Sequence, residues 1–523
     1  MSTDPTAPEA IPARRAAGEP TGESAGPARR AADSRTFSGA LGWTVLGTLV
    51  PGLGLWRSGR RAAGGAAMAV FLLLLAGGVY LGFNRSLAGS LALAPGALQG
   101  IAIGLVVLAV LWVAVIGFSH LALRPANPSV GQRAAGALVV AALSFLVAAP
   151  MAVGAGGIWS AATFVDTVFG NDETPNSTQP TINAADPWKD KDRINFLILG
   201  GDSGYDRAAT LGDRTDTIIV ASIDTHSGAT TLFTLPRNTE KMPFPADSPL
   251  HRYYPNGFYN GTGPDRAEYL LNAMYRNVPN HVPHDTLGKT KNFGADVVKV
   301  SVGEALGLKL DYFVLVNMDG FKDFINAIGG ITVNVNYRIP IGGQTDQHVK
   351  PDGYIEPGPN QHLNGRLALW YARGRYGLDD YKRMERQRCV INAVVEQSTP
   401  QAVLTNFQSI LAAGQKTIQT DVPRSLLPAL VDLGMKVKGT KLRSVTFTPG
   451  VAGFLSYNPN WDKVRSRVQK ALKETESGVS PSASATPSGS ASATPSSSAS
   501  ASPTGKAKSD DLAAVCGYHP EKG

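Results

Sequence analysis

The large apolar residues in the first third of this chain are gathered in four blocks, at about residues 39–56, 62–83, 98–118 and 134–158. The last three blocks are long enough to cross a bilayer, which takes roughly 20 apolar residues. The first block is shorter and is interrupted by "VPGLGLW", so we expect a re-entrant or interfacial hairpin there. A cleavable signal peptide does not have this form. The sequence therefore predicts a transmembrane region over residues 38–160 with about three spans.

Basic residues beside the apolar blocks predict the orientation. Arg57, Arg60 and Arg61 follow the first block, and Arg124 and Arg133 lie between the third and fourth. Because Lys and Arg favour the cytoplasmic side of a membrane, both loops and the N-terminus should be inside. With three spans, everything after about residue 160 is then outside. The alternative is four spans, which would return the C-terminal domain to the cytoplasm.

Composition divides the remaining chain. Residues 1–37 have almost no large apolar side chains and predict a disordered cytoplasmic tail, and residues 161–190 predict a polar linker. We expect a globular domain over residues 191–473, a Ser/Ala/Thr/Pro-rich low-complexity stalk over 474–510 and a C-terminal tail over 511–523. The net charge of +8 is accompanied by no nucleic-acid-binding motif, so no nucleic acid partner is expected.

The globular region combines short β-branched runs with helical patterns. The runs are "INFLIL", "TIIVASI", "TTLFTL", "YFVLVN", "ITVNV" and "SVTFT", and the helical patterns lie near residues 265–276, 295–307, 319–328, 382–397 and 424–436. A turn at residues 224–228 predicts a hairpin between the second and third runs. The predicted fold class is α/β, with a mixed β-sheet covered by helices on both faces.

Ser203 lies in Gly-Asp-Ser-Gly, a sequence that suggests a serine nucleophile. Such a serine needs a positioned base, usually His, that is held by a third group. The one histidine before Ser203, His120, lies among the membrane segments, and the later ones lie in turn-like or polar contexts. A serine hydrolase therefore stays a minor alternative, and the neighbouring Asp202 is the better functional candidate.

Five arginines are gathered in "WYARGRYGLDDYKRMERQRCVINAVVEQ". They are Arg373, Arg375, Arg383, Arg386 and Arg388. Guanidinium groups repel one another unless they share an anion, and their planar donors fit phosphate oxygens bidentately. The segment therefore predicts a phosphate or diphosphate site. The alternative is a solvated helix with Arg–Asp and Arg–Glu ion pairs.

The arrangement within this segment follows from its pattern. If the first part is extended, Arg373 and Arg375 point to the same side of the chain. The second part is helical, and Arg383 and Gln387 share one of its faces at four-residue spacing. Asp380 lies at or near the start of that helix, as a cap or a ligand.

A second polar group follows other strands. Pro236 ends a strand and places Arg237 on the next loop, where α/β folds commonly bind ligands. Asp202 and Asp216 lie at the ends of neighbouring strands and could hold a hard divalent cation through their carboxylate oxygens. Ordinary turn aspartates are the alternative. The sequence contains no Walker motif, which argues against a P-loop nucleotide site.

Several stretches between Ile194 and Gln397 resemble, in the same order, the LytR-CpsA-Psr family of cell-wall glycopolymer ligases, in its actinobacterial form. After a strand and Gly-Asp-Ser, they are "DRTDTIIVASID", "TLFTLPRNT", "LKLDYFVLVNMDGFKDFINAIGGITVNV" and "PGPNQHLNGRLALWYARGRYGLDDYKRMERQR". The resemblance implies an α/β/α domain that encloses an apolar cavity for a lipid tail. In this chain the cavity would be lined by the β-branched strands and by helices around residues 321–328.

The resemblance also implies the activity. It is an extracytoplasmic, membrane-anchored phosphotransferase that moves a glycopolymer from a polyprenyl-diphosphate carrier to peptidoglycan, with a pyrophosphatase side activity as a further expectation. Mg²⁺ (or Mn²⁺) would be held by Asp202 and Asp216, and the catalytic residues would be Arg373, Arg375 and Asp380. The expected diphosphate-binding residues are Arg214, Arg237, Arg373, Arg375, Arg383, Arg386 and Gln387. The implied partners are the lipid-linked glycopolymer, peptidoglycan and membrane lipids.

Two features depart from the family pattern. The family's Pro-Arg-Asp is Pro-Arg-Asn here, so Asn238 supplies no carboxylate. Residues 245–293 are longer than the family's Asn-Ala-Ala-Tyr region, so the basic residue of that region is not carried over. The runner-up function is a non-catalytic polyprenyl-phosphate-binding or regulatory cell-envelope protein, which would need the arginines but not Asp202 and Asp216.

Cys389 and Cys516 are the only two cysteines, which excludes a cysteine metal cluster. A disulfide between them is one expectation if the C-terminal part is extracellular, and it would bring the tail back onto the domain. Two separate thiols are the alternative.

Overall fold

The structure is a computed structural model, and it describes residues 36–84, 87, 91, 94–169, 176–183, 186–202, 214–261, 263–345, 347–398, 418–477 and 510–520. The chain divides into two compact units. One comprises residues 1–83 and 104–154, and the other comprises residues 84–103 and 155–523. The N-terminal tail and most of the low-complexity stalk that the sequence predicts lie outside the described residues.

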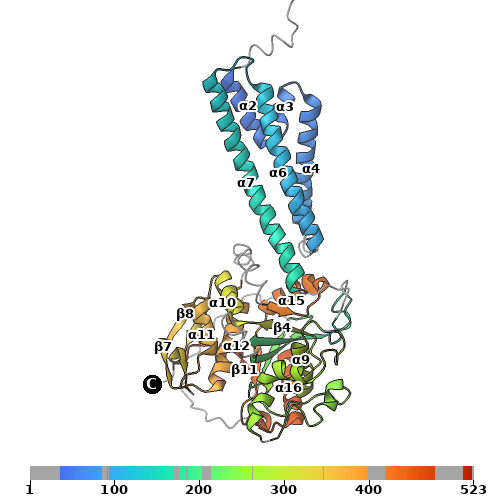
Figure 1. Ribbon diagram of the computed structural model, residues 1–523, viewed down its shortest axis with the longest axis vertical. Coiled ribbons are helices and arrows are strands. Elements are labelled where there is room, and N and C mark those ends of the chain that lie inside the picture. The colour runs from blue at the N-terminus through green and yellow to red at the C-terminus, as the bar shows by residue number, and fades with distance from the viewer. Residues whose placement is uncertain are drawn as a thin grey trace, which may run out of the picture. The chain divides into compact units, whose positions relative to one another are not determined.

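The N-terminal part of the chain is helical, as Figure 1 shows in blue to green. Its helices are α2 (Phe37–Leu49), α3 (Leu53–Arg57), α4 (Arg61–Phe83), α6 (Pro95–Leu123) and α7 (Val130–Val168). Within the described ranges, α4, α6 and α7 are long and apolar enough to cross a membrane. They coincide with the three long apolar blocks of the sequence.

The first apolar block forms a broken helix. Gly52 lies between α2 and α3 with a positive φ of 95°. A β-carbon at this position would lie 2.3 Å from the carbonyl oxygen of Gly64 in α4. Only glycine fits both this backbone conformation and the close approach of α4. The break falls at the interrupted "VPGLGLW" sequence, and the re-entrant or interfacial placement of this segment stays a prediction.

A seven-stranded sheet lies at the centre of the globular domain, in the order β11-β10-β3-β2-β1-β4-β9. Its strands are β1 (Arg193–Gly201), β2 (Thr215–Asp224), β3 (Thr230–Thr234), β4 (Tyr312–Val316), β9 (Ile418–Thr420), β10 (Arg443–Thr446) and β11 (Asp510–Asp511). β2 pairs antiparallel with β1 and β3, whereas β1 pairs parallel with β4 and β10 parallel with β3. The expected mixed sheet and its β2–β3 hairpin are confirmed. The short edge strands β9 and β11 were not predicted.

Helices cover both faces of this sheet (Figure 1). Successive side chains of a strand point to opposite faces. Leu197 and Leu199 of β1 therefore pack with α8 (Leu271–His281), α9 (Phe293–Leu306) and α16 (Trp461–Ser477), whereas Phe196 and Ile198 pack on the opposite face with side chains of α12 (Asp380–Gln397). Helix α15 (Leu427–Lys438) lies against this second face through a further cluster that includes Ile194. Both-face coverage is the arrangement that the sequence predicts.

A smaller hydrophobic cluster holds the residues between β4 and α12 together. Its elements are α10 (Met318–Ala327), β5 (Ile331–Val335), β6 (Ile339–Gln344), β7 (Val349–Ile355), β8 (Gly358–Leu363) and α11 (Gly365–Arg373). β5 pairs with β8, and β6 pairs with β7. Phe321, Phe324 and Ile328, which were expected near a lipid cavity, are partly buried and pack against this cluster.

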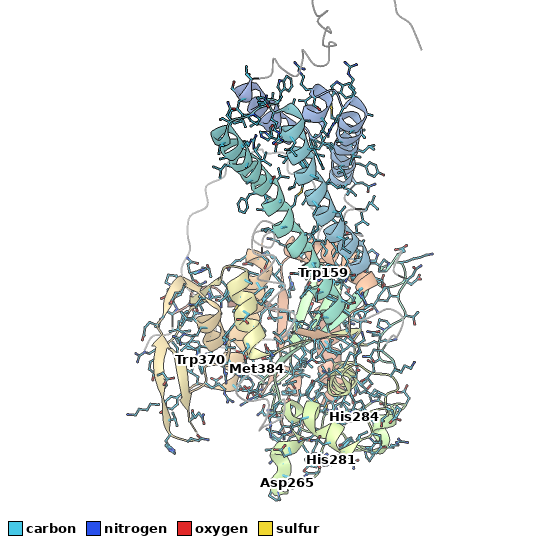
Figure 2. The ribbon with its side chains drawn as sticks, turned by 45° about the horizontal axis from the view of Figure 1, so that its top comes forward. Trp159, Asp265, His281, His284, Trp370 and Met384 are labelled. Carbon is cyan, nitrogen blue, oxygen red and sulfur yellow. A yellow bond between two sulfur atoms is a disulfide. The ribbon has the colours of Figure 1, made fainter. Side chains whose placement is uncertain are left out.

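Residues 365–373 form a helix, so the extended segment assumed for Arg373 and Arg375 is wrong. Asn364 caps α11 by accepting a hydrogen bond from the Leu367 N–H. Arg373 is the last residue of α11, and Arg375 lies in the following turn, so the two do not share a strand face. Figure 2 labels Trp370 on this helix and Met384 on α12.

Other predicted boundaries also differ from the structure. The pattern near 265–276 is split into a 3-10 helix, Pro264–Tyr269, and the start of α8 at Leu271. Shorter 3-10 turns lie at Pro249–Arg252, Arg424–Leu426 and Val451–Gly453. Helix α16 continues to Ser477, past the predicted start of the stalk, and Thr475 is buried within it. In the predicted linker, Asn176 and Thr178 hydrogen-bond to the buried Asp296 of α9, at 2.8 and 2.5 Å, so this part packs on the domain.

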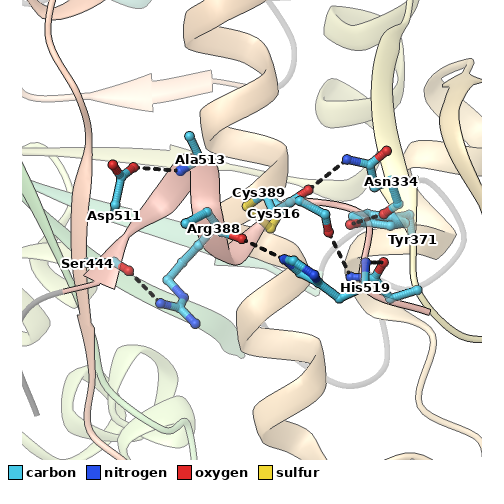
Figure 3. Close-up of a disulfide and its surroundings, with 12 residues drawn as sticks. Asn334, Tyr371, Arg388, Cys389, Ser444, Asp511, Ala513, Cys516 and His519 are labelled. Atoms are coloured by element: carbon cyan, nitrogen blue, oxygen red, sulfur yellow. Dashed lines mark hydrogen bonds between the residues drawn. A yellow bond between two sulfur atoms is a disulfide. The ribbon is translucent and has the colours of Figure 1, made fainter. Parts of the chain in front are cut away.

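A disulfide joins Cys389 in α12 to Cys516, 127 residues later (Figure 3). The residues around Cys516 are also held by backbone contacts. β11 pairs with β10, and α17 (Leu512–Val515) buries Leu512 completely. The carbonyl of Cys516 accepts a hydrogen bond from Asn334 at 2.9 Å. Of the two alternatives for the cysteines, the structure therefore has the bonded one, with residues 510–519 docked on the domain.

Candidate active site

Asp216 occupies an irregular position in β2. β1 and β2 pair in regular antiparallel register until Gly200 faces Thr217, and then Gly201 faces Thr215. Asp216 is thus the extra residue of a β-bulge, a device that redirects a side chain out of the regular ladder. Asp202 follows at the end of β1, where its N–H donates to the carbonyl of Arg214 at 2.9 Å. The two predicted metal ligands therefore lie on neighbouring strands at the same end of the sheet.

Arg237 lies between the carboxylates of Asp216 and Asp380 at this edge of the sheet. It follows β3 and Pro236, as the sequence predicts. Its Nη1 is 2.7 Å from Oδ2 of Asp216, and its Nε is 3.4 Å from Oδ1 of Asp380. These carboxylates and that of Asp202 raise the pKa of Arg237, although burial acts in the opposite direction. Arg237 therefore stays fully charged at its place between acidic side chains.

Asp216 is held ionised by its neighbours. Burial alone would raise its pKa, but the charge and hydrogen bond of Arg237 and a hydrogen bond from Asn272 keep the pKa below its usual value. Asn272 Nδ2 lies 3.1 Å from Asp216 Oδ1, so both carboxylate oxygens accept hydrogen bonds. The backbone N–H of Asn272 also donates to the carbonyl of Arg237 at 3.0 Å. The start of α8 thus fixes the Arg237 loop and the Asp216 side chain together.

Helix α12 supplies a second carboxylate and arginine. Asp379 caps the helix by accepting from Lys382 N–H, and Asp380 is its first residue. The Nε and Nη2 atoms of Arg383 lie 2.9 and 3.0 Å from the two carboxylate oxygens of Asp380, and its Nη1 donates to the carbonyl of Asp216 at 2.9 Å. The Arg383 side chain is only 3% exposed. Its donors are therefore directed at the protein, and it ties α12 to the bulge of β2.

Arg373 comes to the same edge from the end of α11. Its Nη2 lies 3.6 Å from Oδ1 of Asp202, and its guanidinium carbon lies 5.1 Å from the ring centre of Trp370. Nη1 also contacts the sulfur of Met318. The Arg373 side chain is 31% exposed, ten times the exposed fraction of Arg383. Solvent, and hence a ligand, can reach Arg373. Arg375 is exposed in the turn that follows.

Other predicted site residues are directed elsewhere. Arg386 Nη1 donates to the Tyr337 hydroxyl at 3.1 Å, and its Nη2 donates to the carbonyl of Gly374. Arg214 pairs with Glu268 at 2.5 Å. Arg386 thus supports the turn after α11, and Arg214 pairs with the 3-10 helix Pro264–Tyr269 that precedes α8, so within the described part of the chain no hydrogen bond or ion pair joins either side chain to Asp216 or Arg237. Gln387, which donates to the carbonyl of Ala372 at 3.3 Å, also supports the end of α11.

Sequence reasoning missed two groups beside this site. Asn272 begins "Asn-Ala-Met-Tyr", which stands where the family has Asn-Ala-Ala-Tyr, but the long segment before it hid the match. Glu268 accepts a hydrogen bond from Asn277 and pairs with Arg214 and Arg276, and these contacts outweigh its partial burial and lower its pKa. The spacing Asn-x-x-Tyr at the start of a helix was the signal that could have identified Asn272. Ser203 lies outside the described residues.

The described site thus brings three guanidinium groups and three carboxylates together. They are Arg237, Arg373 and Arg383 with Asp202, Asp216 and Asp380. Carboxylate oxygens are the kind of ligand that Mg²⁺ and Mn²⁺ prefer, but among the described residues no three His, Cys, Asp or Glu side chains lie close enough together to hold a metal ion by themselves. The neighbouring Oδ1 of Asn272 is buried and accepts no hydrogen bond, so it offers a further oxygen.

Comparison with known proteins gives the family. The sequence profile of the LytR_cpsA_psr family matches residues 164–458, which is more than half of the chain and includes every residue of this site. The chain is 27% identical over 344 residues to the Enterococcus faecalis protein named polyisoprenyl-teichoic acid–peptidoglycan teichoic acid transferase TagU, a match that covers 64% of this chain and 95% of that one.

Two other relatives are matched over less of their length. The Streptococcus mutans biofilm regulatory protein A is 27% identical, with 50% of this chain and 58% of that one covered. The Bacillus subtilis TagV transferase is 25% identical, with 52% and 64% covered. The crystal structure of Bacillus subtilis TagV aligns with a TM-score of 0.37 at 23% identity, over 55% of this chain and 97% of that one. On the extent of the profile match, this chain belongs to the LytR-CpsA-Psr family.

Proposed function

We propose that this chain transfers a glycopolymer from a polyprenyl-diphosphate carrier to peptidoglycan at the outer face of the cytoplasmic membrane. The observation that carries the proposal is the group formed by Arg237 and Arg373 with Asp202, Asp216 and Asp380 at one edge of the sheet. The similarity to proteins named as teichoic acid transferases supports the same reaction class. A phosphodiester and a polyprenyl phosphate are the products.

The proposed orientation places the N-terminus inside the cell and the globular domain outside. Three helices that are long enough to span a membrane support an odd number of crossings. Arg60 and Arg61 at the start of α4, Arg124 just after α6 and Arg133 in the first turn of α7 mark the cytoplasmic side, because basic residues are retained there. A disulfide in the globular domain also suits the outside of the cell.

In the proposed reaction, a hydroxyl oxygen of the acceptor sugar bonds to the phosphorus that carries the glycopolymer. The bond from this phosphorus to the bridging oxygen breaks, and polyprenyl phosphate leaves with the electron pair. Arg237 and Arg373 are partly exposed and would bind the non-bridging oxygens, where negative charge increases as the leaving group departs. Asp380 would accept the hydroxyl proton or orient Arg237, and Arg383 would hold Asp380 in place.

Before substrate binds, each of these arginines contacts a carboxylate. An anionic diphosphate would therefore compete with Asp202 and Asp216 for Arg373 and Arg237. We propose that Asp202 and Asp216 hold Mg²⁺ or Mn²⁺, which neutralises charge on phosphate oxygens when bound. When both bind, the carboxylates would pair with the cation and the arginines with the diphosphate, in place of each other. The net charge of the site would stay unchanged, because the cation and the diphosphate diester carry opposite double charges.

The test uses full-length protein in detergent with Mg²⁺, a polyprenyl-diphosphate-linked oligosaccharide and peptidoglycan fragments. Mass spectrometry should detect polyprenyl phosphate and a sugar-phosphate adduct on peptidoglycan. Release of polyprenyl phosphate together with a free sugar phosphate, without an acceptor, would reveal the pyrophosphatase side activity. Carrier binding without turnover, given a competent acceptor, would instead establish the non-catalytic binding protein.

Substitution of a carboxylate distinguishes the enzyme from the non-catalytic binding protein. Asp202→Asn should abolish transfer but keep carrier binding if the protein is an enzyme, because the arginines remain. Transfer that persists in this variant would overturn the cation-assisted reaction. A fluorophosphonate probe should leave the protein unlabelled, and labelling at Ser203 would revive the serine hydrolase.

A further inference from the structure

The membrane region contains a cavity of about 280 Å³ that lies far from the residues of the proposed reaction along the chain. It is an open cavity that lies where α6 ends and α7 begins, beside the first residue of α2. Its walls include the apolar side chains of Phe37, Leu121 and Val140 and the basic side chains of Arg124 and Arg133. The cavity is therefore amphipathic, with cationic groups beside an apolar wall.

The charges of this cavity have no acidic counterpart nearby in the sequence. Between residues 34 and 165 the chain contains no Asp or Glu. Arg133 Nε donates to the carbonyl of Pro128 at 3.2 Å, which fixes the base of the guanidinium without neutralising it. Arg124 lies one residue past the end of α6. Two neighbouring guanidinium groups that no carboxylate of the described membrane helices neutralises attract an anion, and their planar donors suit phosphate oxygens.

The start of α7 adds to the positive potential. Ser129 and Gln132 form a reciprocal cap, in which Gln132 N–H donates to Ser129 Oγ at 3.2 Å and Ser129 N–H donates to Gln132 Oε1 at 3.0 Å. Gln132 lines the cavity. The N-terminal end of a long helix carries a partial positive charge and favours anions. This end and the two arginines thus face the same space.

On its inner side, the cavity is bounded by His120, which is held in place by contacts with neighbouring helices. His120 is 8% exposed, and its Nδ1 lies 3.3 Å from the hydroxyl of Thr44, which donates to the carbonyl of Ala40 at 2.8 Å. On its other side the ring meets α7, where a β-carbon at Gly136 would lie 2.5 Å from Nε2. Only glycine allows this approach. The packing of α2, α6 and α7 therefore holds an imidazole at the cavity that carries the arginines.

We infer that this cavity binds the phosphate headgroup of an anionic phospholipid. The arginines and the α7 N-terminus would bind the phosphate, and the apolar wall would contact the upper part of an acyl chain. Basic pockets between transmembrane helices bind such headgroups, particularly on the cytoplasmic side, and the proposed orientation places Arg124 and Arg133 on that side. The inference needs only that these helices lie in a membrane, so it stands apart from the transfer reaction.

The experiment is native mass spectrometry of the full-length protein, released from detergent after incubation with phosphatidylglycerol or phosphatidylcholine. We expect retained phosphatidylglycerol and little phosphatidylcholine. In Arg124→Gln/Arg133→Gln, retention should fall about 25-fold, because each basic side chain near an anionic headgroup contributes about a factor of five. The matched control is Arg60→Gln/Arg61→Gln, which removes the same charge from exposed positions at the start of α4 and should retain the lipid.

Two results of these lipid comparisons would overturn the inference. One is equal retention of phosphatidylglycerol and phosphatidylcholine by the wild type, which would mean that the headgroup charge is not recognised. The other is equal loss of lipid from both double variants, which would indicate general surface attraction. A third arm adds inorganic phosphate to the wild type. Displacement of the lipid by phosphate at equal concentration would assign the cavity to a free anion instead of a lipid. This arm needs no variant and so does not depend on how the variants fold.

Discussion

Arg383 makes a sharper prediction than its place in an arginine-rich segment suggests. The sequence assigns it to diphosphate binding, yet its side chain is only 3% exposed. Its Nε and Nη2 bind both oxygens of Asp380, and its Nη1 binds the carbonyl of Asp216. We therefore predict that Arg383 positions the site and that Arg383→Met lowers stability as well as transfer.

The expected magnitude follows from these contacts. Removing one partner of a buried ion pair costs about 3–5 kcal/mol. Asp380 retains Arg237 at 3.4 Å and is 27% exposed, which favours the lower end, about 3 kcal/mol. One kcal/mol shifts the unfolding midpoint of a domain of this size class by about 2–4 °C. Arg383→Met should thus lower the midpoint by about 6–12 °C.

The assay is thermal unfolding of the full-length protein in detergent, beside a transfer assay. Arg338→Met is the matched control, because Arg338 also pairs with a carboxylate, that of Glu356 at 2.9 Å, but is 59% exposed. Exposed pairs contribute about 0–1 kcal/mol, so the control should unfold close to the wild type. An Arg383→Met midpoint within about 2 °C of the wild type, with transfer lost, would refute this reasoning and return Arg383 to direct ligand binding.

Arg373→Ala and Arg375→Ala should keep the wild-type unfolding midpoint and lose transfer, because both side chains reach solvent; unchanged turnover in either variant would contradict this. Asp216 has a lowered pKa, so its ionised form stabilises the folded state above the unfolded pKa of about 3.9, and this contribution disappears as pH falls through the lower folded pKa. Asp216→Asn should therefore show a smaller loss of unfolding midpoint on acidification than the wild type, and parallel pH curves would argue against the assignment. Cys389→Ser or Cys516→Ser should reduce stability by about 2–5 kcal/mol, and gel mobility of the wild type that does not respond to reductant would be inconsistent with the bridge.

The central strands of the fold were predictable because each is a continuous β-branched run. The edge strands β9 and β11 were not, since three and two residues are too few to show a period. Helix α11 has a recognisable helical signal in the sequence. Asn364 is a capping residue, and Leu367, Trp370 and Tyr371 follow at helical spacing. The two-residue spacing of Arg373 and Arg375 at its end also fits an extended segment.

The sequence predicts which residues form the site better than it predicts the contacts among them. Strand ends and loops correctly brought Asp202, Asp216 and Arg237 to one edge. The bulge at Asp216 depends on the register between β1 and β2, which the sequence of either strand does not specify. The partner of Asp216, Asn272, arrives from a helix that follows a long insertion. Buried donors such as those of Arg386 could not be told from ligand-binding ones without the fold.

The docked C-terminus changes what a cut in the chain would do. Ser477 ends α16 on the domain and Asp510 begins β11 on the same domain, so the low-complexity segment between them is anchored at both ends. Together with the bond from Cys516 to Cys389, this closes the polypeptide into a covalent ring of 128 residues, counted inclusively from Cys389 to Cys516. A protease that cleaves once between residues 478 and 509 would therefore open the ring but release nothing, and the two fragments would separate only after reduction.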